Sequence, residues 1–136
     1  MIKLSGIRDV HRRVRSMPAD PDAAAELTSW SGQEDTTLDL SGLDASDADL
    51  TDADLAMGLF TQSRLAGAIL VASDLYRAHL ESAVLDRADL TRASLVKAVL
   101  DGASMQAAVL SEANLGSAEL AEVDARSASF RTARLN

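Results

Sequence analysis

The sequence predicts an all-β solenoid that follows a short helical segment, and two regularities of spacing predict it. Every fifth residue from Leu40 to Leu135 is non-polar, which makes twenty positions in register. The residue two places before each of them is never charged, and fourteen of these twenty are alanine. Because 25% of the chain is charged, this run of uncharged positions indicates a structural repeat.

A period of five is typical of neither a helix nor a strand. It moves around an α-helix of about 3.6 residues per turn, and it changes faces in a strand, where side chains alternate. Two inward residues spaced by two and followed by outward ones therefore predict a short extended segment and a corner, repeated around an axis. Successive coils should pair backbone to backbone, about 4.8 Å apart.

The repeat unit itself has a characteristic sequence. The segments Ala53–Met57, Ala88–Arg92 and Ala113–Ser117 read ADLAM, ADLTR and ANLGS. They resemble the A(D/N)LXX motif of the pentapeptide-repeat protein family, and the repeats run on without an insertion. This resemblance implies a right-handed quadrilateral β-helix with four repeats, and so twenty residues, in each coil. Residues 38–135 would then hold about five coils.

Residues 1–35 lie outside the repeat, and we expect them to form an N-terminal helical capping segment in front of the β-helix of residues 36–136. Asp20 followed by Pro21 predicts the start of a helix that reaches Trp30, because aspartate caps helices and proline suits their first turn. The apolar residues of this segment should cover the open end of the first coil, which otherwise exposes core and unpaired backbone.

An earlier helix is also expected in this segment, with Ser5 as its N-cap. Its apolar residues recur at spacings of three and four, and they would add to the cap. An alternative interpretation makes this a basic helix that contacts nucleic acid, a membrane or the chain's own acidic first coil. The apolar residues are Ile7, Val10, Val14 and Met17, and the cations are Lys3, Arg8, Arg12, Arg13 and Arg15.

The parts of a catalytic or cofactor site are missing from the sequence. It has no cysteine, two histidines and no glycine-rich phosphate loop, so we expect no enzyme activity and no cofactor. The acidic stretch from Asp44 to Asp54 superficially resembles a calcium loop, but it lacks the central glycine and terminal glutamate of an EF-hand. Steps of five residues should place its aspartates on successive faces. We therefore expect no metal site.

Charge and hydropathy restrict the partners and the location. A net charge of −8 disfavours direct binding to nucleic acid or to an anionic membrane, because both require cations. No stretch approaches the roughly 18 apolar residues of a spanning helix, and the first residues lack the apolar region of a signal peptide. We expect a cytoplasmic protein, and the lack of cysteine fits a reducing compartment.

Three surface features are candidates for partner binding. Carboxylates crowd the first coil, an apolar column should run along one corner, and the final coil, with no capping segment after it, should expose core and favour a homodimer. The acidic candidates are Asp39, Asp44, Asp47, Asp49, Asp52, Asp54 and Asp74; the column comprises Leu59, Tyr76, His79, Val96 and Val99; the C-terminal dimer end comprises Phe130 and Leu135.

Two functions remain open. The first is a non-catalytic protein-binding β-helix that acts as a scaffold, an adaptor or a regulatory module. The second follows from the resemblance, since several members of the family are acidic rods that mimic DNA and bind DNA gyrase or topoisomerase IV. Such members give quinolone resistance or self-protection against a gyrase poison. The acidic first coil agrees with mimicry, whereas the cations of the later coils and the lack of a C-terminal helix depart from it.

Overall fold

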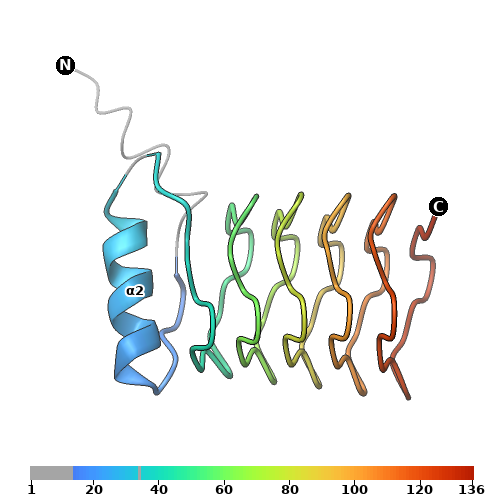
Figure 1. Cartoon of the computed structure of the whole chain (residues 1–136), viewed down its shortest axis with the longest axis horizontal. Helices are drawn as coiled ribbons and strands as arrows, with labels where there is room; N and C mark the ends of the chain where they lie inside the picture. The colour runs from blue at the N-terminus through green and yellow to red at the C-terminus, as the bar shows by residue number, and fades with distance from the viewer. Residues whose placement is uncertain (1–13, 34) are drawn as a thin grey trace.

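The structure, a computed structural model, describes residues 14–33 and 35–136. One helix, α2, spans Pro21–Ser31. The residues from 38 onward form stacked coils, and in the described ranges their extended residues are joined by single β-bridges. Figure 1 shows α2 at one end of the stack and the C-terminus at the other. No helix in the described part of the chain is long and apolar enough to cross a membrane.

The bridges between coils keep one register throughout. In the described coils, sixteen parallel bridges run from residue 39 to residue 134, and each joins residues twenty positions apart. Hydrogen bonds flank each bridge. For example, the Leu40 amide donates to the Leu59 carbonyl at 2.8 Å, and the Leu59 amide donates to the Leu38 carbonyl at 2.9 Å. One coil therefore takes twenty residues, or four repeats.

A turn closes each five-residue repeat. The amide three places after an inward residue donates back to its carbonyl, as from Leu43 to Leu40 at 2.9 Å. The second central residue of the turn has φ between 55° and 72° at all nineteen described turns, of which only three hold glycine. This backbone costs about 1–2 kcal/mol for residues with a Cβ. It is stabilised because the same residue donates its amide to the next coil, as from Met57 to the Tyr76 carbonyl at 2.7 Å.

The core runs along the axis of the stack. Each predicted inward residue from Leu40 to Leu115 is at most 1% exposed, and most residues two places earlier are buried alanines. The prediction of an aliphatic core is confirmed over these four coils. In the last coil it holds less well, since Leu120 and Leu135 are 36% and 56% exposed and Phe130 is half-buried.

Helix α2 forms where the sequence predicts it. The Asp20 side chain accepts a hydrogen bond from the Ala23 amide at 3.0 Å, and Pro21 occupies the first turn. One face of the helix is buried and joins the core of the first coil through Ala23, Leu27 and Trp30.

The earlier predicted helix is wrong over its described part. Residues 14–20 are not helical, and Ser16 instead forms an antiparallel bridge with Asp49 of the first coil. Pro18 disfavours helical backbone just before it, and the edge of the first coil offers unpaired backbone groups. Met17 is 40% exposed and so covers little of the core. The predicted residues from Ser5 to Arg13 lie outside the described ranges.

Candidate functional site

Stacking in register gathers carboxylates on one side of the coils. We call this side the acidic face, and it consists of residues 38–42, 58–62, 78–82, 98–102 and 118–122, which the bridges at 39, 59, 79, 99 and 119 align. The acidic face has five Asp and Glu residues and no Lys or Arg. The other sides of residues 38–136 together have ten Asp and Glu residues and eight Lys and Arg residues. The five carboxylates belong to Asp39, Glu81, Asp101, Glu119 and Glu122.

One column of residues on the acidic face is less polar in its middle than at its ends. Leu59, His79 and Val99 are joined in series by bridges, with Asp39 before them and Glu119 after them. Leu59 is 36% exposed, His79 is exposed and Val99 is half-buried. An apolar centre with a charged rim is typical of protein-binding surfaces.

Two of the carboxylates on this face make contacts that hold them in place. The Glu81 Oε1 atom lies 3.4 Å from His79 Nδ1, and it has no hydrogen-bond partner although it is buried. Asp101 accepts a hydrogen bond from the Ala121 amide of the next coil at 2.9 Å. The hydrogen bond therefore fixes the Asp101 carboxylate on the face, which favours recognition of a complementary surface.

The predicted apolar column is placed at one corner. Leu59, His79 and Val99 lie on the acidic face, while Tyr76 and Val96 lie on the turns that lead into it. These turns pair between coils, as the Arg77 amide donates to the Val96 carbonyl at 3.0 Å. The prediction thus selected residues from two adjoining columns.

The predicted acidic residues are spread over all four sides. Among them only Asp39 lies on the acidic face; Asp44 and Asp47 share the next side, Asp49 and Asp52 the third, and Asp54 and Asp74 the fourth. The structure does not bring them together as one patch. In residues 14–33 and 35–136, no three His, Asp or Glu side chains are placed to hold a metal ion.

Five of these aspartates have a local role in the turns. Each carboxylate accepts a hydrogen bond from the amide two residues later, which the turn would otherwise leave exposed. The amide donors and their carboxylate acceptors are Ser41 and Asp39 at 2.9 Å, Ser46 and Asp44 at 3.0 Å, Thr51 and Asp49 at 3.1 Å, Ala56 and Asp54 at 3.2 Å, and Tyr76 and Asp74 at 3.0 Å.

These hydrogen bonds affect the titration of two carboxyl groups. The Ser41 amide lowers the pKa of Asp39, and the Ser46 hydroxyl followed by its amide lowers the pKa of Asp44, because each donor favours the ionised form. Asp44 also lies 3.9 Å from the Arg64 guanidinium.

One arginine of the predicted basic helix contacts the first coil. Arg15 donates to the Asp52 carboxylate at 3.0 Å, and its amide donates to the Asp49 carbonyl at 2.8 Å. Of the partners considered from the sequence, this contact is with the chain's own acidic first coil, although Arg15 itself lies at a bend and not in a helix. Lys3, Arg8, Arg12 and Arg13 lie outside the described ranges.

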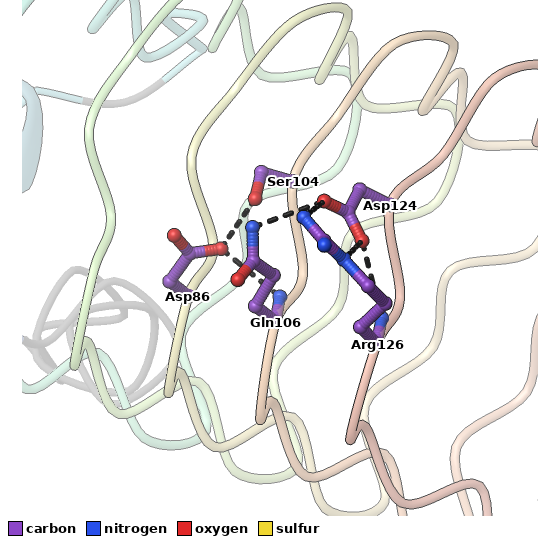
Figure 2. A network of polar contacts seen from close by, with 5 residues as sticks. All are labelled: Asp86, Ser104, Gln106, Asp124 and Arg126. Carbon is purple, nitrogen blue, oxygen red and sulfur yellow. Dashed lines mark hydrogen bonds and ion pairs between the residues drawn. The ribbon is translucent and has the colours of Figure 1, made fainter.

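The side that follows the acidic face uses its charges internally in the later coils, as Figure 2 shows. Asp86 accepts hydrogen bonds from the Ser104 hydroxyl at 2.5 Å and from the Gln106 backbone amide at 3.0 Å. The Gln106 side chain donates to Asp124 at 3.0 Å, and Arg126 contacts Asp124 at 2.8 Å. Hydrogen bonding from Arg126 lowers the pKa of Asp124. This network ties three coils together and leaves these groups less available to a partner.

Glu81, Asp101, Glu119 and Glu122 were not selected from the sequence. They are far apart along the chain, at positions that look unremarkable one by one. They can be found in the sequence by using the period of twenty residues. When the charges of every fourth repeat are added, this side has a more negative sum than the other three. The prediction from sequence compared the charge of successive coils along the axis and did not compare the four sides.

Comparison with known proteins agrees with this repeat. Residues 59–95, 73–111 and 98–136 match a family described as pentapeptide repeats, with eight copies. No curated protein sequence matches the chain. The chain is similar to several solved structures, of which three are described below.

A structure of QnrB1, a plasmid-mediated fluoroquinolone resistance protein, has 11% identity and a TM-score of 0.56, and the match covers 69% of this chain and 64% of that one. A pentapeptide repeat protein from the Arabidopsis thaliana thylakoid lumen has 26% identity over 68% of this chain and 61% of that one, with a TM-score of 0.43. Rfr23 from the cyanobacterium Cyanothece 51142 has 23% identity over 92% and 79%, with a TM-score of 0.44. This chain thus spans under two thirds of the length of the first two.

Proposed function

Because this chain belongs to the pentapeptide-repeat family, we propose that it is a non-catalytic protein-binding module whose acidic face contacts a basic surface of its partner. The observation that carries the proposal is the distribution of charge. The acidic face holds five carboxylates without a Lys or Arg, around a centre formed by Leu59 and Val99. A basic partner would be steered to this side by the summed field and would bury the apolar centre.

Two structural proposals accompany this function. We propose that the coils wind as a right-handed quadrilateral β-helix over residues 36–136, as in the family. Residues 1–35 would then form the N-terminal capping segment, which the burial of Leu27 and Trp30 against the first coil supports. The cap would protect one end of the core, so that the sides of the coils remain as the binding surfaces.

A pair of matched charge reversals tests the role of the acidic face. Glu81→Lys with Glu122→Lys reverses two charges on it, and Asp47→Lys with Glu112→Lys makes the same change of net charge on other sides. Proteins captured by the natural chain and by both variants are compared by quantitative mass spectrometry. We expect a partner that the first variant loses and the second retains. Equal loss from both variants would refute a role for this particular side.

Binding to DNA gyrase or topoisomerase IV is the second candidate. The observation that favours it is that four of the five coils carry a carboxylate on one side that has no Lys or Arg, with coils about 4.8 Å apart, so that this side presents negative charge along the axis to a surface that holds phosphates. The likeness to QnrB1 supports the fold alone. A supercoiling assay with gyrase, with and without a quinolone, tests the candidate. If the purified chain leaves supercoiling unchanged in both conditions, gyrase is not the partner.

Contact between two copies through the last coil is a further part of the proposal. The exposure of Leu120 and Leu135, with Phe130 half-buried between them in sequence, supports an apolar contact there. Sedimentation velocity of the natural chain and of Leu135→Asp distinguishes the outcomes. A dimer that the variant dissociates supports the contact, and a monomer for the natural chain at all concentrations excludes it.

A further inference from the structure

A cationic hollow lies at the corner beside the acidic face. Its volume is about 420 Å³, and it is lined by Arg77, His79, Lys97, Val99, Ser117 and Glu119. Arg77, Lys97 and Ser117 hold the same turn position in three successive coils, and His79, Val99 and Glu119 are aligned by bridges on the acidic face. Two columns from adjoining sides thus form its walls.

The two cations of the hollow are left without a carboxylate partner. In the described part of the chain neither Arg77 nor Lys97 forms an ion pair, whereas Arg15, Arg64 and Arg126 do. The bridge register places their backbones one coil apart, about 4.8 Å. Like charges on neighbouring coils repel each other, so an anion between the two side chains relieves that repulsion in addition to its direct attraction.

The guanidinium of Arg77 is held in a defined position. Its Nε donates to the Tyr76 hydroxyl at 3.0 Å, and its Cζ lies 5.4 Å from the centroid of the Tyr76 ring. The contact leaves the two terminal nitrogens of the guanidinium for a ligand. A guanidinium that is already oriented loses less conformational entropy when it binds an anion.

From these features we propose that the hollow binds a phosphoryl oxyanion. A phosphoryl group has three acceptor oxygens and about two negative charges, which match the Arg77 fork, the Lys97 ammonium and the Ser117 hydroxyl. Val99 contributes an apolar wall, and Glu119 opposes the ligand from the acidic face. The group can come from free phosphate or from a phosphorylated side chain. The hollow shares Val99 and Glu119 with the acidic face, but its binding of an anion can be tested without a protein partner.

Titration of the ¹⁵N-labelled chain, monitored by NMR, tests this site. Inorganic phosphate, acetate, and a peptide with and without a phosphoserine are the probes. We expect phosphate to shift the amides and side chains of Arg77, Lys97 and Ser117 more than acetate does. Arg77→Gln with Lys97→Gln should weaken phosphate binding at least about fivefold, and Glu119→Gln should strengthen it about twofold.

The matched control is Arg87→Gln with Arg92→Gln, which removes two cations from the same turn position at other corners. Equal weakening by both double variants, or shifts spread over all the arginines, would refute the site. Tighter binding of the phosphopeptide than of phosphate assigns the ligand to a partner protein, and equal binding assigns it to the free ion. Equal shifts with acetate would contradict the preference for phosphoryl groups.

Discussion

Gly58 leaves the space that the ring of Phe60 occupies. A Cβ at position 58 would lie 2.5 Å from Cε2 of Phe60 and 3.0 Å from the Leu55 carbonyl oxygen. Phe60 is 1% exposed, and most other repeats place leucine and alanine at the same two positions. The large inward residue and the missing side chain therefore compensate for each other within one repeat.

This relationship predicts strong coupling between the two positions. Gly58→Ala should lower the free energy of unfolding by about 1–3 kcal/mol, because the added methyl group overpacks the core. Phe60→Leu should restore most of that loss in the double variant, since it recreates the usual alanine–leucine repeat. Urea denaturation of the natural chain, both single variants and the double variant measures the coupling. Additive losses would show that the ring does not determine the cost.

Two buried serines should respond oppositely to replacement by alanine. Ser63 and Ser73 occupy the same position on opposite sides of one coil, but the Ser73 hydroxyl donates to the Leu70 carbonyl at 2.8 Å, whereas the Ser63 hydroxyl is buried without a partner. Ser73→Ala should destabilise the chain by about 1 kcal/mol, and Ser63→Ala should leave it unchanged or stabilise it. Thermal unfolding of both variants under one condition checks the order. A larger loss from Ser63→Ala would contradict this prediction.

Glycine should be preferred at the left-handed turn position. Gly102 has a φ of 72° and Ala107, one repeat later, has a φ of 57°. Gly102→Ala should lower stability by about 1 kcal/mol, because a residue with a Cβ is strained in the left-handed backbone conformation of this turn. Ala107→Gly should change it little or raise it, since relief of strain is offset by the greater entropy of unfolded glycine. Chemical denaturation of both variants measures the difference, and stabilisation by Gly102→Ala would contradict it.

Asp44 should make the stability of the chain depend on pH in the acid range. The Ser46 donors lower the pKa of Asp44 in the folded chain, so the ionised form is favoured by folding. That contribution is fully present above the pKa of an aspartate in the unfolded chain, about 3.9. It is lost as the pH falls through the lower pKa that Asp44 has in the folded chain. Asp44→Asn keeps the acceptor oxygen but cannot ionise, so its stability should fall less steeply below about pH 4.

The control for this prediction is Asp47→Asn, which removes a carboxylate that caps no turn in the described coils. Unfolding in urea at a series of pH values gives the slope for the natural chain and both variants. If Asp44→Asn and Asp47→Asn give the same slope, the acid dependence comes from net charge and the turn contact does not contribute to it.

Much of the fold was predictable because its information is local. The alternation of inward leucine and alanine repeats every five residues, and it correctly identified the buried residues from Leu40 to Leu115. The cap at Asp20 and the proline after it correctly located the start of α2. The described end of the earlier predicted helix, from Val14 to Met17, was predicted wrongly because its apolar spacing took no account of Pro18 or of the free edge of the first coil, with which Ser16 pairs.

The candidate site was much less accessible to sequence reasoning. The prediction that Asp44, Asp49 and Asp54 lie on three successive sides is confirmed, but their hydrogen bonds as local acceptors in the turns were not predicted. Glu81 and Asp101 are inconspicuous in the sequence, but they stack on one side. The pattern of five residues determines whether a side chain points inward or outward, whereas the residues that share a side follow from the twenty-residue coil that the bridges define.

The sequence by itself determined the repeat, the aliphatic core and the start of the helix. Only the tertiary structure decided which charges share a surface, which aspartates cap turns and where Arg77 and Lys97 meet. The physical reason is the range of the interactions. Inward burial and turns are set within five residues, whereas a side or a corner exists only after the chain has closed a coil and paired residues twenty positions apart.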